Sequence, residues 1–313
     1  MNDIAAGAEL KRADAEKQIK RKKRGSSATE AGFLAGSLSV PFIEWVLANA
    51  ESPVKLALRG AEPIAYVAGK LSKMRPEKFG AAAEWQSVYI TKRMSNLRGD
   101  LASAFAYESY NRRRLEEGCG LGGSMDYGLS GTVERISLQY DAMSKYFLQC
   151  GLGDAWTLAD TGLSGTMAED LGEFGPCKSL FFASIGGGPR VSGFINQPQY
   201  QDIMDRAVLP AFKESRVPMV DACWRITDFM DAMPKEAQSP SGCRIADDGR
   251  AEPVLVPEDP EIRVMRSDYI VGLKNAVRAY DKEKLPSIGR VLDELFSGGT
   301  IDKYIGTLTG RQR

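Results

Sequence analysis

The sequence contains no histidine among its 313 residues. This absence excludes Ser-His-Asp and Cys-His catalytic arrangements, histidine acid–base chemistry, and histidine ligation of zinc, non-haem iron or haem. Enzymes without histidine work with carboxylates, lysine, tyrosine or Mg²⁺ instead. The chain also has no Walker loop, kinase signature, nucleophile elbow or zinc motif. The composition therefore favours a protein that is not an enzyme, with no catalytic residues, no metal and no cofactor.

Cysteines are few, and long hydrophobic runs are missing. The five cysteines are odd in number and form no C-x-x-C pair, which argues against a disulfide framework and a structural zinc site. The N-terminus lacks the apolar region of a signal peptide, and the most apolar stretch, residues 31–50, is interrupted by Pro41 and Glu44. We expect a soluble protein without a membrane span. Its expected place is the cytoplasm, or a particle assembled in a reducing compartment.

The charge balance is neutral overall but uneven along the chain. Lysine plus arginine and aspartate plus glutamate both number 41. Residues 1–25 hold eight of the cations against four acids, so this segment is basic and the remainder is acidic. Its densest part contains Lys17, Lys20, Arg21, Lys22, Lys23 and Arg24. Such arms bind nucleic acid or acidic protein surfaces without reading sequence.

Helical patterns dominate the rest of the sequence. Prolines at 41, 53 and 63 stand where helices favour proline, in the first turn, and residues 133–149 form one apolar stripe at helical spacing. The strand signal is confined to about residues 180–195, where two apolar runs flank a Gly-Gly-Gly-Pro turn and predict a hairpin. The expected fold is mainly α: a bundle-like body of many short helices with one small β-hairpin and an extended basic N-terminal arm.

This pattern divides the chain into five parts. We expect a basic arm, a helical domain, a hairpin with a helical segment, a linker rich in proline and acid, and C-terminal helices. The respective bounds are 1–30, 31–175, 176–233, 234–260 and 261–313.

A phrase of glycines and threonines occurs twice. CGLG begins at Cys119 and again at Cys150, and GLSGT ends at Thr132 and again at Thr166. Glycine closes helices and threonine caps their starts, so we expect a helix–loop–helix unit copied once. Capping gives no reason for the two cysteines, which leaves covalent attachment of a group at Cys119 and Cys150 as an alternative.

Two other candidate sites carry positive charge. Arg112, Arg113 and Arg114 lie in a segment expected to be helical, and they join the arm as candidate contacts to nucleic acid or a partner. Gly187, Gly188 and Arg190 form a candidate anion site, because glycine backbone N–H groups beside an arginine can hold an anion. A tight turn explains these glycines equally well.

These observations predict a non-catalytic structural or assembly protein of a large complex, of the virion or nucleoprotein type. Its expected partners are protein subunits of the same or a larger assembly, with nucleic acid as a further partner of residues 11–24, and we expect a homo-oligomer. One alternative is an enzyme that uses carboxylates such as Glu169 and Asp170 with Mg²⁺ on an anionic substrate. Another is a linker protein that carries a covalent group on cysteine.

Overall fold

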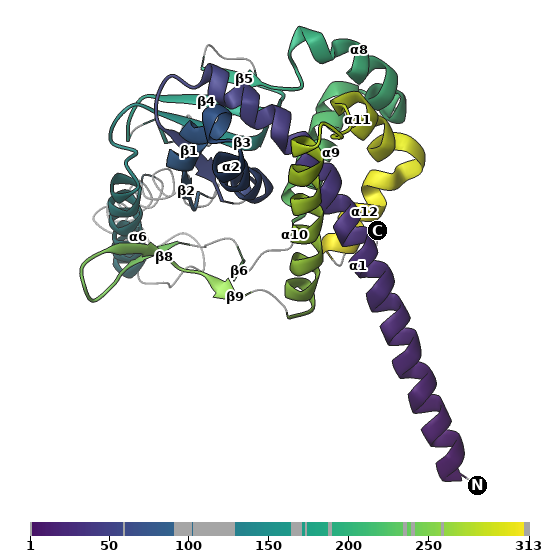
Figure 1. Cartoon of the computed structure of the whole chain (residues 1–313). Helices are drawn as coiled ribbons and strands as arrows, with labels where there is room; N and C mark the ends of the chain where they lie inside the picture. The colour runs from purple at the N-terminus through teal and green to yellow at the C-terminus, as the bar shows by residue number, and fades with distance from the viewer. Residues whose placement is uncertain are drawn as a thin grey trace.

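The computed structural model describes residues 2–58, 60–90, 102, 129–163, 171–172, 174–186, 190–233, 237–238, 242–257 and 260–309. Side chains are described from residue 25 onward, except at 129–132, 163, 237–238, 256–257 and 261. The chain builds a parallel sheet surrounded by helices (Figure 1). The expected mainly α body with one hairpin is therefore wrong, and the protein has an α/β core.

The central sheet has five strands in the order β2-β1-β3-β4-β5, and every neighbouring pair is parallel. This order is common in doubly wound sheets, where the chain builds outward from β1 in one direction and then in the other. The strands are β1 (Val54–Ala57), β2 (Gln86–Val88), β3 (Trp156–Leu163), β4 (Cys177–Ser184) and β5 (Val191–Gly193).

The predicted hairpin at residues 180–195 is two parallel strands. Ser179 of β4 lies opposite Val191 of β5, and Phe181 lies opposite Gly193, with both strands running the same way. The apolar runs predicted the two strands correctly. Their relative direction was predicted wrongly, because an apolar run carries no information about which way its neighbour points.

β1 and β3 were not expected as strands. The sequence predicts a helix starting at Pro53, but all four residues of β1 are buried. A parallel strand covered on both faces loses the alternation that identifies a strand. β3 carries Thr157, Asp160 and Thr161 in buried positions, and this polar composition is typical of a loop.

Helices supply the rest of the fold. α1 continues through residues 24–32, whose serine, threonine and glycine residues suggest a hinge in the sequence, and Pro41 lies inside it. The prediction of helices is confirmed at Pro63, over 133–149 and for three segments of the tail. The longer helices are α1 (Asn2–Asn49), α2 (Glu62–Met74), α6 (Leu129–Gln149), α9 (Pro218–Asp231), α10 (Pro260–Asp281), α11 (Ile288–Phe296) and α12 (Thr300–Thr309), and the short ones are α3 (Pro76–Phe79), η1 (Gly80–Glu84), η2 (Pro198–Tyr200), α8 (Gln201–Ile203), η3 (Met204–Val208), η4 (Leu209–Phe212) and η5 (Ser297–Gly299).

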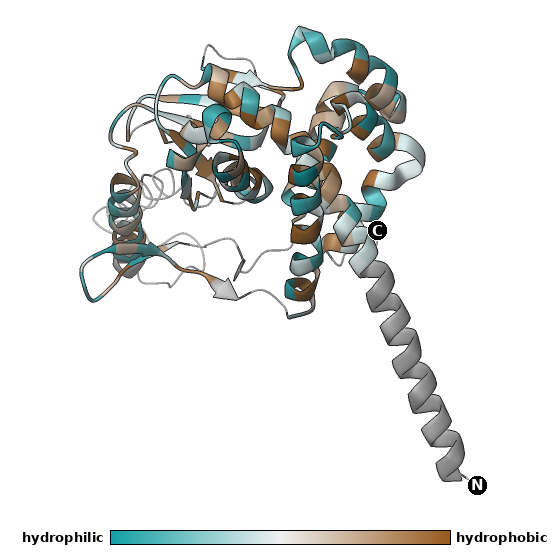
Figure 2. Ribbon diagram, viewed as in Figure 1, coloured by the Kyte–Doolittle hydropathy of each residue, from teal (hydrophilic) through white to brown (hydrophobic). Residues whose placement is uncertain are grey.

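Two helices cover opposite faces of the sheet. Phe182 of β4 meets Phe42 of α1 at a ring-centroid distance of 5.6 Å. The neighbouring Phe181 points to the other face, as the pleat requires, into a second cluster that contains Phe147 of α6. Figure 2 shows hydrophobic and hydrophilic residues along α6 and α10, as expected of helices buried on one side. The architecture is therefore a sheet between two helical layers.

The segment predicted as a linker contains four short strands. β6 (Ala237–Gln238) pairs with β9 (Val256–Pro257), and β7 (Cys243–Ile245) pairs with β8 (Ala251–Pro253), both antiparallel. The β7–β8 hairpin lies along α6, where the backbone N–H of Ala251 donates to Oε1 of Gln149 at 2.9 Å. This hairpin is thereby joined to the sheet's second helical layer.

The second copy of the repeated phrase does not form the expected helix–loop–helix. α6 begins at Leu129, so Thr132 lies within its first turn and not before it. Gly151 ends α6 with φ +74°, as glycine at a helix end was expected to do. The second GLSGT begins inside β3, at Gly162, and Thr166 lies outside the described residues. The loop expected in the second copy is therefore strand β3, while the loop of the first copy, residues 119–128, lies outside the described residues.

Within the described chain, residues Gly25–Asn49 of α1 form one helical segment long and apolar enough to cross a membrane by composition. In this fold, 67% of its most apolar stretch is buried by the rest of the protein. A core helix of a soluble protein has the same length and composition.

Candidate functional site

The basic arm is the N-terminal half of α1. Its six candidate cations, residues 17 and 20–24, lie on one continuous helix with the buried core segment that follows. Figure 1 shows this half of α1 extending beyond the body. A helix rises about 1.5 Å per residue, so the five consecutive cations at 20–24 fall within about 6 Å along its axis. Successive residues are about 100° apart, so these positions are distributed around the whole helix.

The base of the arm is fixed to α10. A Cβ on Gly32 of α1 would overlap the carbonyl oxygen of Tyr269, and a Cβ on Gly272 of α10 would overlap the carbonyl of Thr29. The Thr29 hydroxyl donates to the Asp268 carbonyl at 3.1 Å. Because the two backbones touch, the direction in which the helix leaves the body is set by the core.

The carboxyl edge of the sheet is the second candidate site. In doubly wound sheets, ligands bind outside the carboxyl ends of the strands, where the strand order reverses. Here that point lies between β1 and β3. The Thr161 hydroxyl of β3 donates to Oδ1 of Asp231 at 2.7 Å, and both groups lie directly against the backbone of Gly60. Thus the end of α9 occupies the position where such folds hold a ligand.

α10 closes the same edge from the side of α2. Nη1 of Arg266 contacts Oε2 of Glu62 at 2.9 Å, and both side chains are largely buried. The neighbouring Tyr269 is completely buried, and its hydroxyl has no hydrogen-bond partner among the described residues. Burial raises the pKa of Tyr269, and the charges of Glu62 and Asp231 raise it further. The ion pair holds α10 against α2 at the edge of the sheet.

A third polar cluster surrounds the end of α6. Lys55 of β1 is 4% exposed, and its Nζ donates to the carbonyl of Cys150 at 2.7 Å and to Oε1 of Gln86. The ammonium thus caps the negative end of the α6 dipole. Burial lowers the pKa of Lys55, and the nearby Cys150 offsets part of this shift.

The Cys150 thiol lies in the same cluster. Burial raises the pKa of Cys150, although a hydrogen bond with Tyr146 and the charge of Lys55 act in the opposite direction. Burial together with Cys150 raises the pKa of Cys243 to about 12. Thiolates are the nucleophilic form, so both cysteines are poorly suited to covalent attachment at neutral pH. Cys119, the other candidate attachment site, lies outside the described residues.

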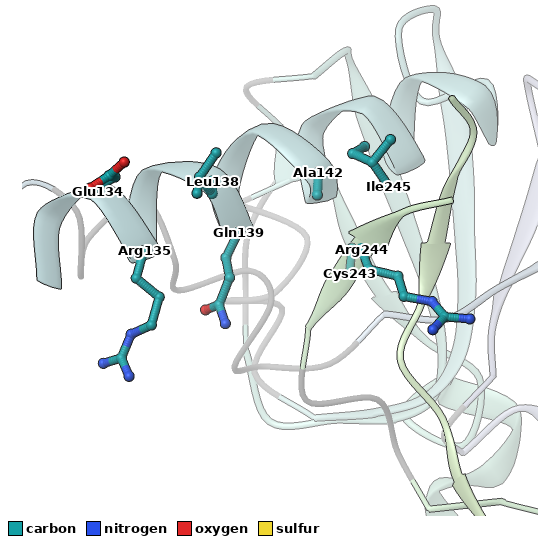
Figure 3. Close-up of a pocket in the computed structure, with 8 residues that line it drawn as sticks. All are labelled: Glu134, Arg135, Leu138, Gln139, Ala142, Cys243, Arg244 and Ile245. Atoms are coloured by element: carbon teal, nitrogen blue, oxygen red, sulfur yellow. The ribbon is translucent and has the colours of Figure 1, made fainter. Parts of the chain in front are cut away.

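An open cavity of about 530 Å³ lies between α6 and β7. Figure 3 shows Arg135 and Gln139 projecting from the same side of α6, with Ile245 beyond Ala142 toward the hairpin. Arg244 on β7 pairs with Glu252 at 2.6 Å. The walls are mixed in character, and no cluster of three or more His, Cys, Asp or Glu that could hold a metal occurs among the described residues.

The remaining sequence candidates are placed only in part. Arg190 is exposed, and its carbonyl accepts from the N–H of Ser179 at 2.7 Å. Its partners in the candidate anion site, Gly187 and Gly188, lie outside the described residues, as do Arg112, Arg113, Arg114, Glu169 and Asp170. No local sequence pattern indicated the clusters around Asp231 and Lys55. Their members are 70 to 171 residues apart in the first cluster and up to 95 residues apart in the second.

Comparison with protein-family models gave no matching family, and comparison with curated proteins gave no matching sequence.

Proposed function

We propose that this protein is a non-catalytic assembly protein that contacts nucleic acid or neighbouring subunits through the basic N-terminal half of α1. The observation that carries the proposal is the continuity of α1. A segment with eight cations belongs to the same helix as a core segment packed against α10. The arm is therefore held at a fixed direction from the body, where its cations can contact a neighbouring subunit or a polyanion.

The carboxyl edge of the sheet supports a non-catalytic role. Where doubly wound enzymes bind substrate or cofactor, this chain packs its own Asp231 and Arg266. Asp231 accepts a hydrogen bond from Thr161 of β3, and Arg266 pairs with Glu62 of α2, so both groups join elements of the fold. The sequence adds the lack of histidine, which removes the commonest general base.

The test is binding of a fluorescent single-stranded RNA of mixed sequence at several salt concentrations, with sedimentation to follow assembly. In the test variant, glutamine replaces Lys20, Arg21, Lys22, Lys23 and Arg24. In the matched control, glutamine replaces five exposed cations of the body: Lys274, Arg278, Lys282, Lys284 and Lys303. Neutralised phosphate contacts release counterions, so we expect the slope of log affinity against log salt to fall by about 3 to 5 in the test variant alone.

An arm that contacts subunits instead gives a different pattern. RNA binding is then weak in the wild type, the test variant and the control, while the sedimentation coefficient of the assembly falls in the test variant alone. If the test variant matches the wild type in both RNA binding and sedimentation, the proposal is wrong.

A further inference from the structure

The outer face of α6 exposes two large apolar side chains. Leu138 is 63% exposed and Leu148 is 57% exposed, the highest values among the large hydrophobic residues that the structure describes. Asp141 and Lys145 lie between the two leucines in the sequence. The spacings from Leu138 to Asp141, to Lys145 and to Leu148 are three, four and three residues, and such spacings place all four residues on one stripe of the helix. The two leucines and the charged residues between them form one exposed surface of mixed character.

Asp141 and Lys145 are both exposed, and neither takes part in an ion pair within the described chain. They are one helical turn apart on the same stripe, between the two leucines. The stripe therefore presents one negative and one positive group to whatever covers it.

The four residues are arranged symmetrically about Met143. Leu138 and Leu148 lie five residues on either side of it, and Asp141 and Lys145 lie two residues on either side. Two copies of α6 can pair antiparallel about a two-fold axis that crosses the outer face of the helix at the height of Met143. Each residue of one copy then lies opposite the partner residue that is equally far from Met143 in the other direction along the helix. Leu138 then meets the partner's Leu148, and Asp141 meets the partner's Lys145.

We propose that α6 is the contact surface of a two-fold symmetric dimer of this chain, with the two α6 helices antiparallel across the axis. The same patch must be complementary to itself in such an interface, and this stripe is complementary in both apolar contact and charge. Antiparallel helices in contact lie about 8–10 Å apart, a spacing at which leucines interdigitate. Ile245 is 49% exposed and lines the same α6–β7 cavity as Leu138, so it widens the apolar surface.

The expected affinity is modest. A single helical stripe with a hairpin beside it falls below the roughly 800 Å² per partner of a standard interface. We therefore expect a dissociation constant in the micromolar range, measurable by sedimentation between about 1 and 200 μM. This dimer is independent of the proposed role of the basic arm, since the two surfaces share no residue.

Charge exchange provides the decisive experiment, carried out on the full chain by sedimentation equilibrium. Asp141→Lys places like charges opposite each other and should weaken the dimer at least tenfold, as should Lys145→Asp. The double variant restores opposite charges across the axis and should recover most of the affinity. Circular dichroism of each variant checks that the helix content of the protein is unchanged.

Replacement of a leucine by glutamate tests the apolar contacts of the stripe. Leu148→Glu should abolish the dimer at 200 μM, whereas Val217→Glu, at a position 52% exposed at the start of α9, should leave it unchanged. A wild-type monomer at 200 μM overturns the proposal. It is also overturned if either single charge variant dimerises as the wild type does, or if the double variant fails to recover.

Discussion

At the residue scale, the carboxyl edge of the sheet depends on Gly60. The Thr161 hydroxyl and the Asp231 carboxylate approach the backbone so closely that no side chain fits between them. Glycine is required here for the space it leaves, since larger residues would separate the end of α9 from β1.

Gly60→Ala should lower the free energy of unfolding by about 1–3 kcal/mol, because the new methyl group forces apart the bonded pair in a packed interior. Urea unfolding measures this change. Gly69→Ala is the matched control: it lies within α2, and a Cβ there meets nothing within 4 Å. Alanine favours the helix, so the control should gain about 0.5–1 kcal/mol. Equal effects of the two substitutions would contradict this account of Gly60.

The buried Lys55 adds a residue-scale effect that depends on pH. Its folded-state pKa is below its ordinary value of 10.5 because burial penalises the ammonium. Between these two values the unfolded chain binds more protons than the folded one, so stability rises with pH.

Relative to Lys55→Met, the wild type should therefore become more stable as the pH rises toward 10.5, with no further gain above it. Urea unfolding of both proteins between pH 7 and 11 measures the difference. Lys274→Met, at an exposed position, controls for the general effect of replacing a lysine with methionine. If the difference between the wild type and Lys55→Met stays constant over this pH range, the ammonium is not destabilised by burial.

At the element scale, the contact of α1 with α10 determines how the basic arm leaves the body. Glycines on both helices allow the two backbones to meet, and Gly36 lies so close to α10 that a Cβ would be 2.7 Å from Cβ of Ala276. Such close packing leaves no room for even a methyl group.

Gly272→Ala should destabilise the protein by about 1–3 kcal/mol or more, because the methyl group would overlap the backbone of α1. Thermal and urea unfolding measure the loss, and the exposed Ser267→Ala on α10 is the control. We expect the control to stay within about 0.5 kcal/mol of the wild type. If Gly272→Ala is as stable as the wild type, α1 and α10 can move apart without losing free energy of unfolding.

At the scale of the whole molecule, the two proposed contact surfaces lie far apart. Figure 1 places α6 on one side of the sheet and the N-terminal end of α1 at the opposite end of the molecule. A dimer formed through α6 therefore leaves both arms accessible. Two arms on one particle bind a polyanion more tightly than one, because the second contact is intramolecular.

The sequence by itself determined the features that depend on local properties. Amphipathic periodicity predicted α6, α9 and the tail helices, glycine marked the end of α6, and composition revealed the basic arm. The apolar runs at residues 180–195 were also recognised as strands.

Only the tertiary structure decided the sheet and the sites on it. β1 is buried on both faces and lost its alternation, and the polar residues of β3 find partners such as Asp231, which is 70 residues away from Thr161. Strand direction, the closed carboxyl edge and the burial of Lys55 likewise depend on contacts between distant segments. Local sequence sets how a segment prefers to fold, but the free energy gained by burying it against distant segments decides which element it becomes.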